Sequence, residues 1–375
     1  MPDSAFSQDF RWNQNWVNFL VSVGKSIRRS ACVLLVCGIV PGLAAIGDTT
    51  FATPSQPVQT DVQKASASLS FVRAFSSADD VRRGHPVLGR TLDIIAGTKD
   101  LETRVDALRS PSAVMTDSNH RVFVADPGAK AVHIFDFIHS KYTLLDKGGD
   151  RLGTPVSLAV DGRDNLYVID QRSSTVLIYD SAGKFRGYFG KLRGGESYFD
   201  SPAAIAIDRT TGRIYVCDRY RHMIIIMDDR GRVIGKIGKR GGGDRPGEFR
   251  LPSQVVVGGG ELFVLDAGNT RIQILDTAGN FRRAINLAYA EARSGLTVDN
   301  QGNIYVSDPA LNQIQVFRHD GHRLYTFDPS TIKGANFGHP SALWVDAGSY
   351  LYAVDSESHR VGLFQIGGQN ARQCQ

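Results

Sequence analysis

The sequence is poor in the residues and motifs that carry most enzyme chemistry. It has 4 cysteines in 375 residues, and they are scattered: Cys32 and Cys37 in an apolar N-terminal segment, Cys217 in an expected strand, Cys374 in the tail. This arrangement gives no disulfide framework, and we expect a buried, inert Cys217. No CxxC pair, Walker-type loop or GxSxG turn occurs. The sequence therefore predicts no catalytic residue, no metal ligand set and no cofactor.

A strong charge of either sign is also lacking. The chain holds 43 Lys and Arg against 38 Asp and Glu, a formal net charge of +5. This excess is small and diffuse, and it does not demand a nucleic-acid partner. Gly241–Gly243 follow a basic pair but precede an expected strand instead of a helix, so they cannot cradle a phosphate as a P-loop does. We expect them to form a flexible rim loop.

The long uncharged run in the chain lies near its beginning. Ala31–Gly47 contains seventeen residues without charge and follows Lys25, Arg28 and Arg29. A basic flank, a short apolar run and then small residues are typical of a secretory signal peptide. A retained membrane anchor is the alternative, although Pro41 would interrupt it. Both interpretations predict an exported protein, either periplasmic or anchored outside the cytoplasmic membrane. They assign residues 1–47 to the leader and residues 48–90 to a flexible tether and lead-in.

A pentapeptide of the form apolar–aromatic–Val–x–Asp, varied in its last copy, recurs through the rest of the chain. The six copies are VFVAD, LYVID, IYVCD, LFVLD, IYVSD and LYAVD, ending at Asp126, Asp170, Asp218, Asp266, Asp308 and Asp355. Their spacings of about 44, 48, 48, 42 and 47 residues match the period of propeller blades. Each copy is flanked by short β-branched runs and turn residues, so each repeat reads as four antiparallel strands.

These repeats resemble the NHL-repeat family of six-bladed β-propellers, in particular its exported bacterial members. The resemblance covers residues 91–366 and implies an all-β propeller domain followed by a polar tail, 367–375. Pro111, Pro155, Pro202, Pro252 and Pro340 mark the start of five blades, and the fifth blade starts near Ser294. The family includes binding modules, sensor domains and a few enzymes, so the resemblance predicts the fold more specifically than the function.

The sixth repeat supplies three strands before the tail begins. We predict that an N-terminal strand completes this blade and closes the ring, which removes an exposed seam. Leu92–Ala96 is the segment that we assign to this task, because it stands where the other blades place the outer strand of their predecessor. Leu69–Phe75 is a further candidate strand, and Asp79–Leu88 reads as a polar connection. The first strand of each blade should line the central channel.

The aspartate that ends each pentapeptide invites a metal or catalytic interpretation. A structural role is favoured, because an aspartate at a strand end accepts hydrogen bonds from the backbone of the following turn, and it recurs in all six blades. The loops after the second and fourth strands of each blade must emerge on one face, which we call the loop face. Long, varied loops gather there, so we expect this face to carry function.

The candidate ligand-binding residues on the loop face are Arg219, Tyr220, Arg221, His222, Arg271 and His359. Arg219–Arg221 with the nearby Lys239, Arg240 and Arg245 form a basic, partly aromatic patch that could take an acidic peptide, a glycan carboxylate or a phosphate. Ordinary solubilising surface is the alternative interpretation of these charges.

His222 and His359 occupy equivalent positions in blades three and six. Amidating lyases that resemble NHL propellers bind zinc through histidines at similar positions, but the corresponding residues here in the other blades fall around Lys130, Ser174, Thr270 and Asn312. These residues are poor zinc ligands, and a catalytic zinc site needs about three protein ligands.

We therefore predict an exported, non-catalytic propeller that acts as a rigid recognition scaffold for a protein, peptide, glycan or small ligand at the basic loop face. The N-terminal segment would contact the membrane if it is not cleaved. A metal-dependent lyase or hydrolase with its site at the channel mouth, similar to amidating lyases or lactonases, is the alternative. An RNA-binding NHL platform is a third hypothesis, and export argues against it.

Overall fold

The computed structural model of the chain describes residues 69–82, 106–146, 152–192, 194–332, 335 and 337–367. All of them belong to one compact unit, Lys64–Gln375. The predicted leader, the tether and the tail beyond residue 367 lie outside the described residues. No helix within these ranges is long and apolar enough to cross a membrane.

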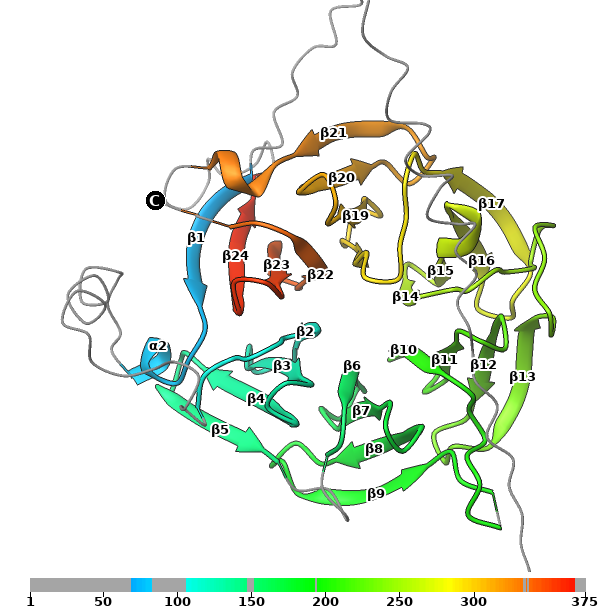
Figure 1. Cartoon of the computed structure of the whole chain (residues 1–375), viewed down its shortest axis with the longest axis horizontal. Coiled ribbons are helices and arrows are strands. Elements are labelled where there is room, and N and C mark those ends of the chain that lie inside the picture. Colours follow the sequence, from blue (N-terminus) through cyan, green and yellow to red (C-terminus); the bar gives the residue numbers. More distant parts are fainter. Residues whose placement is uncertain are drawn as a thin grey trace, which may run out of the picture. The chain divides into compact units, whose positions relative to one another are not determined.

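The described residues form six four-stranded antiparallel sheets, arranged as blades around a centre (Figure 1). Blade one contains β2 (Ala113–Thr116), β3 (Val122–Asp126), β4 (Ala131–Asp136) and β5 (Lys141–Leu145), and blade two β6 (Pro155–Val160), β7 (Leu166–Asp170), β8 (Thr175–Tyr179) and β9 (Phe185–Phe189). Blade three contains β10 (Pro202–Ile207), β11 (Ile214–Asp218), β12 (Met223–Met227) and β13 (Val233–Gly238), and blade four β14 (Gln254–Gly258), β15 (Glu261–Asp266), β16 (Arg271–Asp276) and β17 (Phe281–Asn286). Blade five contains β18 (Leu296–Val298), β19 (Ile304–Asp308), β20 (Gln313–Phe317) and β21 (Arg323–Phe327), and blade six β22 (Pro340–Val345), β23 (Tyr350–Asp355), β24 (Arg360–Ile366) and β1 (Leu69–Phe75). The predicted six-bladed, all-β propeller is confirmed.

The pentapeptides form the second strand of every blade, and each of their residues is buried. A strand covered on both faces should be continuously apolar, which explains why these runs do not alternate. The apolar side chains gather in six clusters, and each cluster joins two neighbouring blades. No blade therefore buries its own faces, and the ring is stable only as a whole.

The strand that completes blade six is β1, not the predicted Leu92–Ala96, which lies outside the described residues. β1 pairs antiparallel with β24 over the register Leu69–Ile366 to Phe75–Val361. Phe71 packs 5.8 Å from Phe364, and Phe75 packs 4.9 Å from Phe135 of blade one (ring centroids). The principle of closure by an N-terminal strand holds, but the propeller begins at Leu69, within the segment assigned to the lead-in. Both segments are short and mostly apolar, so the sequence does not distinguish them, and the packing of β1 against blades six and one identifies it as the closing strand.

A short turn of helix, α2 (Asp79–Arg82), follows β1 where a polar connection was predicted. The Asp80 carboxylate accepts hydrogen bonds from the backbone N–H groups of Ser76 and Ser77, at 2.7 and 2.9 Å. The backbone of Leu108 in turn donates to the carbonyl of Ser76 at 2.7 Å. These bonds fasten the closing strand to the segment that leads into blade one.

The first strands of the blades surround the centre, as predicted, and the fourth strands form the circumference (Figure 1). A channel cavity of about 600 Å³ runs between the first strands. Its walls combine apolar and polar side chains, and the polar residues include Asp208, Arg209, Asp299 and Asp346. These four belong to turns between first and second strands, so the cavity extends to the face opposite the loop face.

Candidate functional site

Six residues at equivalent positions on the loop face share an unusual backbone conformation. Lys130, Ser174, His222, Thr270, Asn312 and His359 have φ between 47° and 59°, in the left-handed region. Each directly precedes the third strand of its blade. The structure thus confirms the predicted equivalence of these positions, and it attributes their recurrence to a turn that requires positive φ.

The aspartates that end the second strands accept backbone hydrogen bonds, as predicted, but in five of the six blades the main donors precede the blade and do not lie in the following turn. We call the residues just before a blade's first strand the incoming segment. Asp218 accepts hydrogen bonds from the backbone N–H groups of Asp200 and Ser201, both at 2.9 Å. Asp126 accepts bonds from the backbone of Arg109 and Ser110 in the same way, and also from Ala129 in the following turn. A carboxylate that binds backbone N–H groups inside the protein is held strongly, so these aspartates fasten five of the six blades to the chain that enters them. Asp308 of blade five differs, because it accepts a hydrogen bond from Leu311 in the following turn.

Burial raises the pKa of the Asp126 carboxyl, but the nearby His133 ring and the backbone N–H groups of Arg109 and Ala129 outweigh it. The pKa of Asp126 therefore lies below its ordinary value. The His133 side chain is fully buried, with Nε2 3.5 Å from Asp126 Oδ2 and Nδ1 2.8 Å from the Tyr142 hydroxyl.

Three of the predicted ligand-binding residues form a cationic and aromatic surface on blade three. Tyr220 is 61% exposed. The guanidinium carbon of Arg221 lies 5.3 Å from the centre of the Tyr198 ring, and Nζ of Lys236 lies 5.9 Å from the same centre. Arg221 Nε also lies 3.5 Å from Asp218 Oδ2. Arg219 is half-buried, and its Nε has no hydrogen-bond partner.

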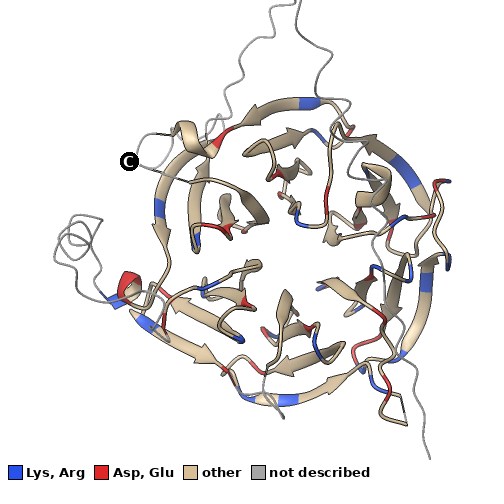
Figure 2. Cartoon of the chain, in the orientation of Figure 1, with Lys and Arg blue, Asp and Glu red and all other residues tan. Residues whose placement is uncertain are grey.

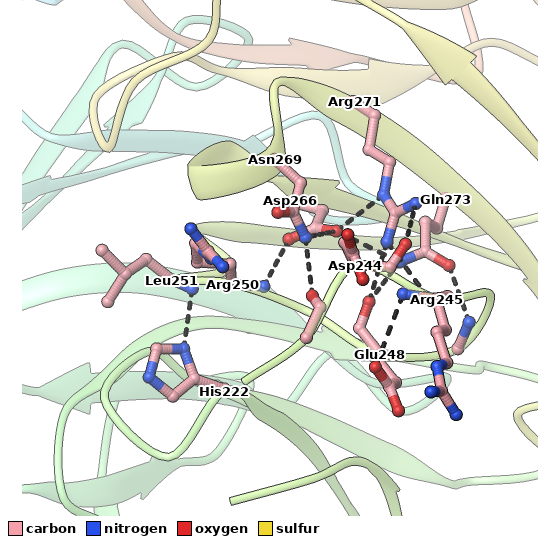
Figure 3. Close-up of polar contacts among 12 residues, drawn as sticks. His222, Asp244, Arg245, Glu248, Arg250, Leu251, Asp266, Asn269, Arg271 and Gln273 are labelled. Atoms are coloured by element: carbon pink, nitrogen blue, oxygen red, sulfur yellow. Dashed lines mark hydrogen bonds and ion pairs between the residues drawn. The ribbon is translucent and has the colours of Figure 1, made fainter. Parts of the chain in front are cut away.

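His222 faces the chain instead of solvent. Its Nδ1 accepts a hydrogen bond of 2.9 Å from the backbone N–H of Leu251, in the segment that enters blade four (Figure 3). Gly242 also lies against the ring, since a Cβ placed there would be 3.2 Å from the imidazole Cγ. The histidine therefore links blade three to blade four. His359 is exposed on blade six, across the ring from blade three, so the structure does not bring the two histidines together.

The guanidinium group of Arg271 donates hydrogen bonds to other groups of the chain (Figure 3). Its Nε donates to Asp266 Oδ2 at 2.8 Å, and its two terminal nitrogens donate to the carbonyl oxygens of Asp244, Arg245 and Glu248 at 2.7, 3.2 and 3.0 Å. A guanidinium with these four acceptors has little donor capacity left for a ligand. The structure therefore assigns Arg271 the task of holding the rim loop between blades three and four.

The same loop, Lys239–Phe249, is held at further points, although we expected Gly241–Gly243 to be flexible. Asn269 Nδ2 donates to the Gly243 carbonyl at 2.8 Å, and Gln273 Oε1 accepts from the Gly247 N–H at 2.9 Å. Lys239 Nζ lies 2.7 Å from Glu248 Oε1. Gly241 and Gly242 have φ of 86° and 75°. Glycine adopts these positive φ values without steric strain, so these residues allow the turn of the loop. Polar side chains of blade four, among them the buried Gln273, thus fix the loop, which the loop sequence alone does not reveal.

A small polar cavity lies on the loop face between blades five and six, and the sequence did not indicate it. Its volume is about 180 Å³, and its walls include Glu291, Arg293, Pro309, His339, Ser341 and Glu357. His339 Nε2 lies 3.1 Å from Glu357 Oε2. The one sequence signal at this place is the missing proline at the start of blade five, which marks an incoming segment unlike the other five.

Cys217 is fully buried, as predicted, and its thiol donates to the Pro252 carbonyl at 3.1 Å. Burial raises the pKa of this thiol, so it is unreactive. Cys374 lies outside the described residues. Among the residues that the structure describes, no three His, Cys, Asp or Glu side chains are grouped to hold a metal ion.

Comparisons with known proteins agree with the architecture. The family model DUF5128, described as a 6-bladed beta-propeller, matches residues 203–310. A search of curated proteins gives no significant match.

Several solved structures have similar folds. A catalytically inactive variant of virginiamycin B lyase from Staphylococcus aureus, with quinupristin, is 14% identical with a TM-score of 0.51, over 71% of this chain and 86% of that one. A gluconolactonase from Xanthomonas campestris is 16% identical with a TM-score of 0.53, over 69% and 87%. A protein of unknown function from Bacteroides thetaiotaomicron is also 16% identical with a TM-score of 0.53, over 70% of each chain. At such identities the likeness concerns the fold alone, and the fold that these comparisons identify is a six-bladed β-propeller.

Proposed function

We propose that this protein is a recognition scaffold that binds an acidic peptide or glycan at the blade-three surface, defined as Arg219, Tyr220, Arg221, Tyr198 and Lys236. The single observation that carries the proposal is the clustering of two cations on one aromatic ring beside an exposed tyrosine. Aromatic and arginine side chains are the residues that most often dominate binding surfaces. Since the ring of blades is rigid, binding would order few groups besides the ligand.

Export to the periplasm or the outer face of the membrane, and membership of the NHL-repeat family, are part of this proposal and rest on the sequence. His222, Arg271 and His359 were predicted to join the binding surface. We now propose that His222 and Arg271 shape it indirectly by holding the neighbouring loop, and we leave His359 as a separate exposed position on blade six.

The test is a titration of the full chain with oligoglutamate and with oligogalacturonate at low and moderate salt. Arg221→Gln and Tyr220→Ala should each weaken binding about tenfold, and added salt should weaken it further. Arg186→Gln is the matched control, because Arg186 is an exposed cation on β9 with its side chain 57% exposed. Binding that is unchanged in both blade-three variants, or lost equally in the control, would contradict the proposal. An RNA oligonucleotide that binds more tightly than either acidic probe would favour the RNA-binding hypothesis instead.

The catalytic alternative is kept for one reason: two of the similar folds are named as a lyase and a gluconolactonase. The 600 Å³ channel cavity offers room for a substrate. Metal analysis of the purified protein addresses this alternative directly. Stoichiometric zinc or calcium that is lost in His359→Ala would favour a metal-dependent lyase or hydrolase over a scaffold.

A further inference from the structure

The basic surface of blade three continues onto the rim loop between blades three and four. Arg221 is followed by His222, whose ring lies against Gly242 of this loop, since a Cβ placed there would be 3.2 Å from the imidazole Cγ. The same ring accepts the hydrogen bond from Leu251, which directly follows Arg250 (Figure 3). The turn of blade three, the rim loop and the segment that enters blade four therefore meet around one side chain.

Most cations on these segments lack an acidic partner. Glu248 pairs with Lys239, and Arg271 pairs with Asp266. Asp244 is the other carboxylate of the rim loop, and it is exposed. Five cations of the turn, the neighbouring β13, the loop and the incoming segment form no ion pair with a described residue: Arg219, Lys236, Arg240, Arg245 and Arg250. All of them except the half-buried Arg219 are exposed. The surface therefore carries more positive charge than its own carboxylates neutralise.

The rim loop holds its cations in fixed positions. Asn269 and Arg271 of blade four donate hydrogen bonds to carbonyl oxygens along the loop, including those of Gly243 and Arg245. In Figure 3 the guanidinium groups of Arg245 and Arg250 point away from this network. Binding at these cations would therefore not have to order the loop, which lowers the entropic cost of association.

The cations span the width of blade three. Lys236 lies over the ring of Tyr198, which packs in the cluster that joins blades two and three. At the other side, Arg245 belongs to the part of the loop that Gln273 of blade four holds at Gly247. Packed sheets lie about 10 Å apart, so one carboxylate or phosphate group cannot contact both sides. The arrangement favours a ligand that carries several anionic groups along its length.

The aromatic side chains narrow the class of polyanion. Tyr220 is 61% exposed beside Arg221, and an exposed tyrosine offers an apolar ring with a polar tip. The C–H face of a pyranose ring packs well on such a ring, whereas a polyglutamate chain has no comparable group. A polyuronate also repeats its carboxylates at a fixed interval on a stiff chain, so it loses less conformational entropy on binding than a flexible peptide does.

We propose that blade three and the rim loop together bind a linear acidic polysaccharide, with its carboxylates on Arg221 and Lys236 at one end and on Arg240 and Arg245 at the other. Tyr220 packs against one of the sugar rings. This extended site rests on the proposed function of the blade-three surface, and it adds the class of the ligand and a second set of cations that the ligand reaches.

Calorimetric titration of the full chain with a trimer and a dodecamer of galacturonate tests the extended site. The dodecamer should bind about a hundredfold more tightly than the trimer or better, because its second contact is intramolecular, whereas additional binding registers alone give about tenfold. The double variant Arg240→Gln, Arg245→Gln should remove most of this advantage and leave trimer binding unchanged. Arg221→Gln should weaken both oligomers. Added salt should weaken the dodecamer more steeply than the trimer, since more ion pairs are lost.

Two further variants separate charge from position. The double variant Arg163→Gln, Arg230→Gln is the matched control, because both residues are exposed cations in turns on the opposite face. It should bind both oligomers as the native protein does. Arg271→Lys keeps the charge but loosens the rim loop, so it should weaken the dodecamer several-fold and spare the trimer.

The outcomes distinguish this extended site from the proposed function. If Arg221→Gln weakens both oligomers but the dodecamer gains no more than about tenfold over the trimer, the blade-three surface binds anions and the extended site is wrong. If neither galacturonate oligomer binds, the extended site fails, and oligoglutamate then decides the proposed function. Tighter binding of oligoglutamate of equal length, or of an RNA oligonucleotide, would overturn the polysaccharide class. Equal loss of dodecamer binding in the control would overturn the site as well, because net charge would then explain the effect.

Discussion

The Nδ1 atom of His222 accepts a hydrogen bond of 2.9 Å from the backbone N–H of Leu251, and this contact joins blade three to the segment that enters blade four. Blade five uses a different side chain for the same contact: Asn312 Oδ1 accepts from the backbone N–H of His339 at 2.6 Å. Both donors have positive φ, 48° and 45°. Two chemically different residues thus perform one structural task at equivalent positions, and a histidine there does not imply a metal.

This relationship predicts the effect of two substitutions at position 222. His222→Ala should lower the free energy of unfolding by about 1 kcal/mol, because the Leu251 N–H loses its acceptor. His222→Asn should restore most of the loss, since asparagine supplies an acceptor and tolerates positive φ. Chemical denaturation of the three proteins measures both differences. Equal stability of the Ala and Asn variants would contradict the structural role.

Arg271→Lys should destabilise the protein although it keeps the charge. Lysine cannot reproduce the fork that reaches Asp266 and three carbonyl oxygens, and we expect a loss of about 2 kcal/mol. The loop Lys239–Phe249 should also become more susceptible to limited proteolysis. Arg282→Lys is the control, because the Arg282–Asp276 pair lies at the surface and should change stability by less than about 0.5 kcal/mol. A larger effect in the control than at position 271 would refute the assignment.

Removal of the closing strand should weaken the whole ring. A chain that starts at Lys64 keeps β1, whereas a chain that starts at Ser77 lacks it and exposes the edge of β24. Loss of Phe71 and Phe75 alone removes roughly 2 kcal/mol of burial each, so the thermal midpoint should fall by about 10 °C or more. Circular dichroism melting and size-exclusion chromatography compare the two. Similar melting of both truncations would mean that another segment closes blade six.

The lowered pKa of Asp126 predicts a loss of stability in acid. The folded pKa is below the unfolded value near 3.9, so the carboxylate stabilises the fold above that value and the contribution disappears as the pH falls through the folded pKa. Asp126→Asn should therefore be less stable than the native protein at pH 7, with a shallower decline below about pH 4. Urea midpoints measured between neutral and acid pH provide the comparison. Parallel pH profiles for the two proteins would rule out this carboxylate as a source of the acid sensitivity.

The outer strands carry cations and no anions. Arg73, Lys141, Arg186, Lys236, Arg282, Arg283 and Arg323 lie on the six fourth strands, which contain no Asp or Glu (Figure 2). Charges on an exposed edge discourage pairing with another sheet. The triple variant Arg186→Thr, Lys236→Thr, Arg323→Thr should therefore aggregate faster in light-scattering measurements. Arg163, Arg230 and Arg240 lie in turns or loops outside the outer strands, and their replacement by Thr gives a control of equal net charge. Equal aggregation of both variants would assign the effect to net charge instead of the edges.

Much of the fold follows from the sequence because each blade is a local unit. The pentapeptides, the turns after them and the glycine hairpins at Gly183, Gly231, Gly279 and Gly321 all depend on residues within a few positions of one another. Six copies of one local pattern fix the number of blades and the order of strands. The equivalence of His222 with Asn312 could likewise be predicted, since it needs only the count from the preceding aspartate.

The contacts between blades, in contrast, are decided by the tertiary structure. Leu69–Phe75 and Leu92–Ala96 are both plausible closing strands, and only the packing of Phe71 and Phe75 on blades six and one selects the first. Arg271 donates its hydrogen bonds to backbone carbonyls of the neighbouring loop, and Asp308 Oδ2 has no hydrogen-bond partner. Both facts depend on where backbone groups distant in the sequence lie, and residue type does not encode that position. The sequence by itself determined a closed ring of six blades. The three-dimensional path of the segments between blades decided which polar groups hold that ring and which are left without a partner, because a hydrogen bond is satisfied in space and not along the chain.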